Sequence, residues 1–188
     1  MFFLRQKVVY PGYGVAYVNR IIEKKVGAQN AAFYELTFLK KDMTFLVPVS
    51  NIESIGLRSL SSQDDIHNIF DTLSKPERKL SPFEFSASSW NKRHKEYQLK
   101  LRRGTLEDLS AIYKDLRTIE AQKRLSFGEK TILQKTEGLL VEEIAVVQDA
   151  EAEKTVQKLR DLCLASTAPE QLQQERIGAT NLLHKSTL

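Results

Sequence analysis

At 188 residues the chain can form one ordinary domain or two small ones, and its 41% hydrophobic and 28% charged residues are typical of a soluble globular protein. No apolar run reaches the ~18–20 residues of a membrane-spanning helix, and a start that turns charged at Arg5 and Lys7 lacks the pattern of a secretory signal. The formal net charge is +4, and the single Cys163 cannot form an intramolecular disulfide, which favours a cytoplasmic protein.

The first sixty residues are predicted to form short strands. Segments rich in β-branched and aromatic side chains alternate with turns that contain glycine or charged residues, which is typical of a small antiparallel barrel or roll. The expected strands are 7–10, 15–22, 32–39, 43–48 and a last short strand at 52–57. Sixty residues bury only a modest core, so we expect this unit to pack against the part of the chain that follows.

From residue 61 onward apolar side chains recur at spacings of three and four, which predicts helices. A capping sequence at Ser62 opens the first helix, and the two prolines Pro76 and Pro82 mark a break that we expect to be a linker. Further helices are expected from about 88 to 103, from 105 through 119, from 126 through 147 and from 151 to 163. The sequence therefore predicts the α+β class, with a small antiparallel β-barrel followed by an all-α helical bundle.

These patterns divide the chain into four parts. The predicted division is a β-barrel domain at 1–60, a helix and linker at 61–85, a helical domain at 86–165 and a C-terminal tail at 166–188.

The positive charge of the chain is concentrated in two blocks, and the denser one lies in the helix predicted after the linker. Between Trp90 and Arg103, six residues are Lys or Arg and only Glu96 is acidic. A local cluster of this kind attracts polyanions more strongly than the net charge of the whole chain suggests.

Residues that could carry catalysis or bind metal are scattered. The histidines show no metal-type spacing to each other or to Cys163, and no P-loop or GxGxxG loop occurs. Glu142 and Glu143, with the acids at 149–153, are interpreted as a solvated acidic helix face. Cys163 is interpreted as an ordinary, partly buried residue without an activating partner. We therefore expect no enzymatic activity, catalytic residue, metal or cofactor.

The only tryptophan, Trp90, stands at the start of a helix whose next turn carries Lys92, Arg93 and Lys95. A helix N-terminus offers free N–H groups, and the cations add charge-assisted contacts to phosphate. An exposed indole beside them can press against a base or wedge into the minor groove. The alternative is that Trp90 packs against Leu99 or the next helix while the lysines are solvated.

A second basic corner, at Lys123 and Arg124, precedes the helix start at Ser126. Contact with phosphate is one interpretation of these three residues. Compensation of the dipole of the preceding helix explains the two cations equally well.

Four segments in this order resemble the CarD/CdnL family of bacterial transcription regulators. Residues 8–16 (VVYPGYGVA) resemble the opening of its Tudor-like barrel, and residues 45–48 with Asn51 resemble that barrel's last strands. Residues 90–97 are similar to the family's DNA-binding helix, and residues 125–130 (LSFGEK) resemble its L-S-x-G-E-K helix start. The four segments span roughly residues 5–147, and together they are specific.

The resemblance implies a Tudor/SH3-like barrel that binds the β subunit of RNA polymerase and a helical domain that contacts double-stranded promoter DNA without much sequence preference. Trp90 matches the family's tryptophan, which wedges into the minor groove at the upstream edge of the bubble and stabilises the open complex. The residues expected to contact DNA are Trp90, Lys92, Arg93, Lys95, Lys123, Arg124 and Ser126. Those expected to contact polymerase are Lys24, Lys25, Leu46, Val47 and Pro48, although some members have an arginine at the position of Leu46.

These expectations describe a monomer in the cytoplasm, associated with the nucleoid through polymerase, that binds neither a membrane nor a small-molecule substrate. Two alternatives remain open: a nucleic-acid binding protein with a Tudor/SH3-like barrel but no polymerase contact, and an interaction scaffold whose basic helix binds an acidic partner.

Overall fold

The N-terminal part of the chain forms an antiparallel sheet of five strands in the order β4-β3-β2-β1-β5. The computed structural model describes all residues except 28, 77–79, 82–85 and 168–188. The strands are β1 (Lys7–Tyr10), β2 (Gly14–Val26), β3 (Gln29–Phe38), β4 (Thr44–Pro48) and β5 (Arg58–Ser59). The strands predicted at 7–10, 15–22, 32–39 and 43–48 are confirmed, and β2 and β3 extend beyond them into a long hairpin arm.

The strands, together with the short helix α1 (Ile52–Ile55), form what we call the β-domain. Its core consists of Val8, Ala16, Val18, Tyr34, Leu36, Phe38, Val47 and Leu57. Several of these residues alternate along β2 and β3 with more exposed ones, as expected for strands with one covered face.

The strand predicted at 52–57 is wrong, because this segment forms α1 after the 3-10 turn η1 (Val49–Asn51). Ile52 and Ile55 are three residues apart, and one helical turn packs both against the core of the β-domain. Gly56 closes the turn in the left-handed conformation (φ +78°), and its N–H donates to the carbonyl of Ile52.

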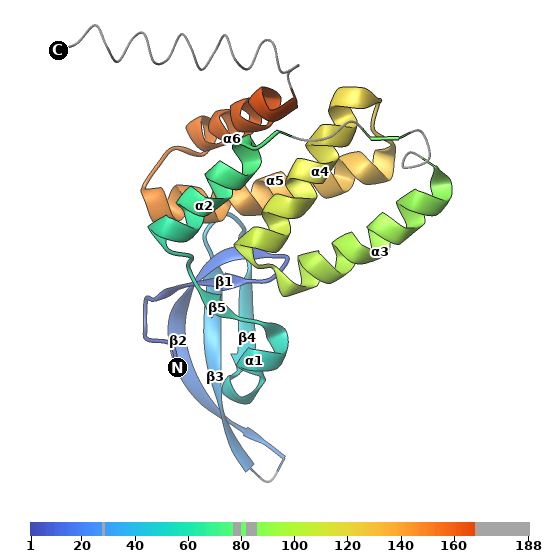
Figure 1. The fold of residues 1–188 in the computed structure, drawn as a ribbon. Coiled ribbons are helices and arrows are strands. Elements are labelled where there is room, and N and C mark those ends of the chain that lie inside the picture. Colours follow the sequence, from blue (N-terminus) through green and yellow to red (C-terminus); the bar gives the residue numbers. More distant parts are fainter. Residues whose placement is uncertain (28, 77–79, 82–85, 168–188) are drawn as a thin grey trace, which may run out of the picture.

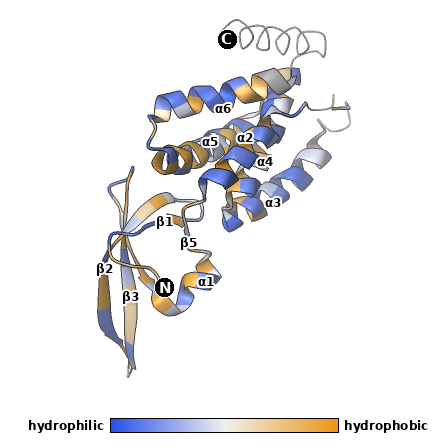
Figure 2. Ribbon diagram, turned by 60° about the vertical axis from the view of Figure 1, so that its left-hand side comes forward, coloured by the Kyte–Doolittle hydropathy of each residue, from blue (hydrophilic) through white to orange (hydrophobic). Residues whose placement is uncertain are grey.

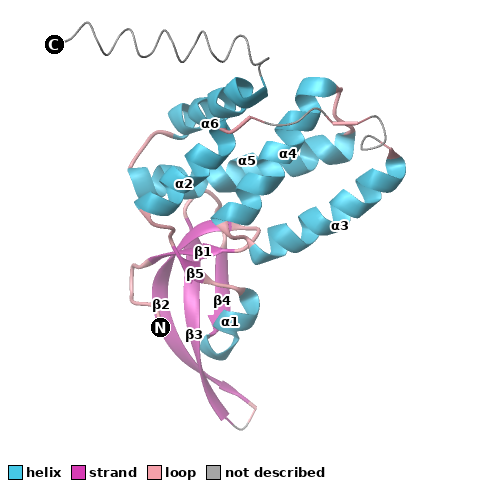
Figure 3. Cartoon of the chain, viewed as in Figure 1, coloured by secondary structure: helices cyan, strands magenta, loops and turns pink. Residues whose placement is uncertain are grey.

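The rest of the described chain is helical, and Figure 3 shows these helices gathered beyond one end of the sheet. The helices are α2 (Gln63–Ser74), α3 (Ala87–Arg103), α4 (Leu106–Gln122), α5 (Phe127–Gln148) and α6 (Ala152–Thr167). The predicted caps are confirmed, since the side chains of Ser62, Thr105 and Ser126 each accept the N–H three residues ahead. The α+β class, with a Tudor-like sheet domain followed by helices, is therefore confirmed.

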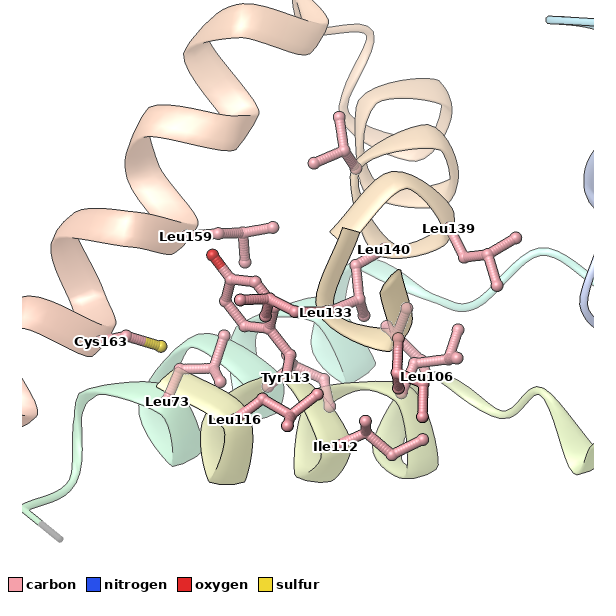
Figure 4. Packing of buried hydrophobic residues seen from close by; sticks show 14 of the residues in the cluster. Leu73, Leu106, Ile112, Tyr113, Leu116, Leu133, Leu139, Leu140, Leu159 and Cys163 are labelled. Carbon is pink, nitrogen blue, oxygen red and sulfur yellow. The ribbon is translucent and has the colours of Figure 1, made fainter. Parts of the chain in front are cut away.

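All five of these helices share one apolar core and form what we call the helical domain. Its buried members include Leu73 of α2, Leu116 of α4, Leu140 of α5 and Leu159 of α6, which lie close together in Figure 4. Cys163 belongs to the same core and is buried, rather than partly buried as expected. The expected linker lies partly outside the described residues, as does the expected tail from residue 168 onward.

A buried ion pair ties the two domains together. The guanidinium of Arg58 on β5 donates to both carboxylate oxygens of Glu143 on α5, at 2.7 Å each. Ser61 adds its backbone N–H (3.0 Å) and its hydroxyl (2.7 Å) to the same carboxylate. Arg58 also donates to the carbonyl of Gly104, which lies between α3 and α4. These bonds fix the β-domain against α5 and against the end of α3 (Figure 1).

A second carboxylate of α5 closes the same junction. Glu142 accepts the backbone N–H of Val15 on β2 at 3.1 Å. Gly14, the residue before it, has φ +106°, and a Cβ there would lie 2.3 Å from Oε2 of Glu142. Only glycine tolerates both this backbone conformation and this close approach.

The interpretation of Glu142 and Glu143 as part of a solvated face is wrong. Their residues are 5% and 1% exposed, whereas Asp149, Glu151 and Glu153 do face solvent. The β-domain covers this part of α5. Glu142 and Glu143 therefore contact the β-domain instead of solvent, and they hold the two domains together.

Glu142→Gln is expected to make the protein more stable relative to wild type as the pH rises. Burial raises the pKa of Glu142 above its ordinary value of 4.5, despite the hydrogen bond from Val15. A group with a raised folded-state pKa contributes stability below its unfolded pKa and loses it as the pH rises through the folded pKa. Glutamine keeps the accepting oxygen without the charge. Urea unfolding of both proteins at pH 4 and pH 7 measures this, and a constant difference between them would contradict it.

Candidate nucleic-acid interface

Helix α3 carries the basic block and presents most of its surface to solvent. The Ser86 side chain caps the helix by accepting the N–H of Ser89, so that Trp90 falls in the first turn. On the inner face Tyr97 and Leu101 are buried, and the Tyr97 hydroxyl donates to Asp115 of α4. Because this inner face is narrow, much of α3 is hydrophilic in Figure 2. Figure 1 shows its first turn far from the strands and its last turn beside β1.

Trp90 is half-buried and rests on the start of α5. A Cβ at Gly128 would lie 3.2 Å from Cζ2 of the indole, so the ring sits directly over this glycine. The rings of His94 and Tyr97 lie beside it, with centroids 5.1 and 6.4 Å away. Trp90 therefore packs against α5 rather than Leu99, which is exposed. The indole is held from below and is partly open to solvent.

Three of the predicted site residues converge on one buried carboxylate, Glu129 of α5. Lys123 donates to both of its oxygens at 3.1 and 3.2 Å, and the Ser126 N–H donates at 2.8 Å. Arg93 approaches it at 3.5 Å from α3. Burial alone would raise the pKa of Glu129, but the hydrogen bonds from Ser126 and Lys123 outweigh it and hold the pKa below its ordinary value.

The Glu129 network has a structural role, since it joins α3, the α4–α5 turn and the start of α5 beneath Trp90. Its charge matters because a buried carboxylate that accepts hydrogen bonds from Lys123 and Ser126 stays ionised and attracts the Arg93 guanidinium. Part of the positive charge that the sequence assigns to an external partner is therefore balanced inside the protein.

The other predicted basic residues, Lys92, Lys95 and Arg124, are exposed. Within the described part of the chain they have no hydrogen bond or ion pair with another side chain. Lys92 and Lys95 follow Trp90 on α3, and Arg124 lies one residue beyond Lys123 in the α4–α5 turn. The first turns of α3, which contain Trp90, and the α4–α5 turn therefore carry exposed cations that remain available to an anion.

Phe127 is a residue of this surface that the sequence analysis missed. It is the first residue of α5 and 88% exposed, directly before the Gly128 that supports Trp90. Together with the partly open indole of Trp90, this ring adds apolar surface to the candidate interface. The sequence contains the necessary information, because Phe127 falls off the apolar stripe that Ile132, Leu139 and Leu140 define on α5.

The residues expected to bind polymerase lie in two separate places on the β-domain. Lys24 and Lys25 are exposed on the hairpin arm, where Lys24 pairs with Ala31 of β3. Leu46 lies on β4 opposite Glu35 and is 44% exposed. The two places are therefore separated along β2 and β3 and do not form one cluster.

Strand β4 lies at the edge of the sheet and contains the other two predicted residues. Val47 points into the core and is 3% exposed, while Pro48 is half-buried and ends the strand. An edge strand offers backbone N–H and C=O groups that a strand of a partner can use. Leu46 and the backbone of β4 are thus the accessible features of this segment, rather than the Val47 side chain.

Among the described residues, no group of three or more His, Cys, Asp or Glu side chains is placed to hold a metal ion. Over the same residues, no helix is long and apolar enough to cross a membrane.

Comparisons with known proteins match both domains. Residues 5–61 match the family model of the CarD-like/TRCF RID domain, and residues 68–160 match that of the CarD, C-terminal domain. The chain is also similar to a Bacillus subtilis (strain 168) protein named "Putative transcription factor YdeB". The two are 24% identical over 149 residues, which cover 79% of this chain and 93% of that protein.

Proposed function

This chain belongs to the CarD-like family, and we propose that it is a transcription regulator whose β-domain binds the β subunit of RNA polymerase while its helical domain holds promoter DNA. In this proposal the DNA contact lies at the upstream edge of the transcription bubble, is independent of sequence and stabilises the open complex.

One observation carries the DNA half of the proposal: a half-buried tryptophan, backed by α5, lies in the same part of α3 as exposed cations that have no described protein partner. Lys92, Lys95 and Arg124 suit the phosphates on either side of a groove. Trp90 rests on Gly128, so a base pressing on its exposed edge cannot push the ring further inward. A supported apolar plane of this kind can wedge between bases, which favours a melted duplex over a closed one.

The polymerase half of the proposal is supported by the edge strand β4 and by the match to a CarD-like/TRCF RID domain. Leu46 supplies an exposed apolar side chain, and the backbone of β4 supplies hydrogen-bonding groups. We propose that β4 is the main contact and that Lys24 and Lys25 on the arm add electrostatic attraction. The buried Arg58–Glu143 pair then transmits the position of polymerase to α3, because it fixes one domain against the other.

The proposed regulator acts as a monomer in the cytoplasm, associated with the nucleoid through polymerase. It needs no cofactor, and no catalytic step is assigned to it.

Promoter opening by RNA polymerase, with and without the full-length protein, tests the proposal. We expect the protein to lengthen the lifetime of the open complex and to bind duplexes of unrelated sequence with affinity that falls steeply with salt. Capture of the isolated β subunit tests the tether. An unchanged lifetime overturns the proposal, and DNA binding without β-subunit capture would favour a nucleic-acid binding protein that does not contact polymerase.

Phe127→Ala is expected to shorten the lifetime of the open complex several-fold while leaving the free energy of unfolding within about 0.5 kcal/mol of wild type. The ring is 88% exposed, so its loss removes little packing, whereas stacking of a base on an aromatic ring is worth about 1–3 kcal/mol. Leu164→Ala, which removes an exposed apolar side chain on α6, serves as the control. Equal lifetimes for Phe127→Ala and wild type would exclude Phe127 from the contact.

A further inference from the structure

A crevice of about 540 Å³ lies where the β-domain meets α3 and α5. Three of the residues that line it are cationic and come from three different elements: Lys41 from the β3–β4 turn, Arg102 from α3 and Lys135 from α5. None of its described lining residues is acidic. An adjoining groove of about 480 Å³ shares Lys41 and Lys135, and it adds a further cation, Lys40, together with the carboxyl groups of Glu137 and Glu142.

Two of the three cations, Lys41 and Lys135, lie against the turn at Gly12 and Tyr13. Lys41 donates to the carbonyl of Tyr13 at 2.5 Å and lies over the Tyr13 ring, 5.6 Å from its centroid. The ammonium of Lys135 lies 3.9 Å from the position that a Cβ on Gly12 would occupy. The turn at Gly12 and Tyr13 therefore brings cations of two domains together.

Basic residues beside the crevice pair with carboxylates, and Lys41 lies near the carboxylate of Glu142. Arg103 forms a bidentate pair with Asp108, and Lys100 pairs with Glu96. Arg102 and Lys135, in contrast, have no hydrogen bond or ion pair with any residue in the described ranges. Clustered like charges repel each other, so such a cluster is most stable when an anion occupies it.

The crevice is continuous with the proposed DNA contact along α3. Lys95 and Arg102 are seven residues apart, which places them on the same helix face about 10 Å from each other. That length corresponds to about three base pairs of duplex at 3.4 Å per step. Gln98 lies between them on this face and also lines the crevice.

We propose that this crevice binds a backbone phosphate of the same duplex that Lys92 and Lys95 hold. The inference rests on the proposed function and extends the DNA contact from the start of α3 to the domain junction. It brings the β-domain, through Lys41, into direct contact with DNA, so that one phosphate bridges both domains.

The double variant Arg102→Gln/Lys135→Gln tests the proposal in the full-length protein. Duplex binding is measured as a function of salt, with thermal unfolding as the check on folding. Each phosphate contact contributes about 0.9 to the slope of log K against log salt, so loss of the one phosphate that the crevice binds is expected to make the slope shallower by about 0.9. Lys75→Gln/Lys154→Gln removes two exposed cations elsewhere and is expected to keep the wild-type slope.

The outcomes separate this inference from the function on which it rests. If wild type binds no duplex, the proposed function fails. If wild type binds duplex and the Arg102/Lys135 variant keeps both affinity and slope, only the crevice assignment fails. A further arm titrates a nucleoside triphosphate at constant ionic strength. If that probe binds wild type but not the variant while duplex binding is equal in both, the crevice holds a soluble phosphate and the DNA assignment is overturned.

Discussion

Arg58→Ala is expected to lower the free energy of unfolding by about 3–5 kcal/mol, because it leaves the buried carboxylate of Glu143 without its counter-charge. The Glu143 side chain is 2% exposed and accepts two hydrogen bonds from Arg58, so water cannot replace the lost partner. The remaining donors on Ser61 favour the lower end of that range. Urea denaturation monitored separately by tyrosine and tryptophan fluorescence measures the loss.

The matched control is Arg103→Ala. Arg103 makes the same two-bond contact with Asp108, also at 2.7 Å, but its side chain is 62% exposed. An exposed pair of this kind contributes less than about 1 kcal/mol. Similar losses for Arg58→Ala and Arg103→Ala would mean that burial does not decide the strength of the junction.

A double variant separates the charge from the packing. Combining Arg58→Ala with Glu143→Gln is expected to recover part of the stability lost by Arg58→Ala alone, because a neutral amide needs no counter-charge. If the double variant is as unstable as the sum of the two single variants, the pair does not act as a unit.

The sequence predicts the elements well where composition and periodicity agree. The hairpin strands are rich in β-branched residues, and the capping serines before α2 and α5 mark helix starts with little ambiguity. The strand predicted at 52–57 is wrong because six residues are too few to distinguish a period of two from the helical period of 3.6. Gly56 ends α1 in a left-handed conformation, but its presence in the sequence does not by itself distinguish the end of a helix from a turn after a strand.

Burial across the junction is the information that the sequence does not contain. On an isolated α5, Glu142 and Glu143 resemble any acidic pair, and only the approach of Gly14 and Arg58 from another domain buries them. Glu129 is a similar case within the helical domain, because α3 brings Arg93 to a carboxylate that already accepts hydrogen bonds from Lys123 and Ser126.

The residues predicted to contact DNA fall into two groups in the structure. Arg93, Lys123 and Ser126 hold the Glu129 network, while Lys92, Lys95 and Arg124 face solvent. Residue type alone cannot separate these groups, because the sequence does not show which arginine faces Glu129 and which faces solvent. Whether either group contacts DNA stays a prediction.

Trp90→Ala is expected to reduce the lifetime of the open promoter complex by on the order of tenfold, since base–aromatic stacking is worth about 1–3 kcal/mol. At low salt its affinity for closed duplex should change little, because Lys92, Lys95 and Arg124 remain. The indole also packs on Gly128, and its removal should cost about 2 kcal/mol of stability, below the 3–5 kcal/mol of a fully buried tryptophan.

A loss of stability could by itself shorten the lifetime, so the decisive comparison is with a variant that destabilises the same core elsewhere. Leu159→Ala removes a fully buried side chain of α6 and is expected to cost about 2–5 kcal/mol without altering α3. If the wedge is correct, Leu159→Ala retains a long-lived open complex at temperatures where it is folded, whereas Trp90→Ala does not. If both variants shorten the lifetime equally, Trp90 acts through the fold. Trp90→Phe keeps a smaller aromatic ring over Gly128. If the ring itself contacts the base, the open-complex lifetime of Trp90→Phe is expected to lie between those of wild type and Trp90→Ala.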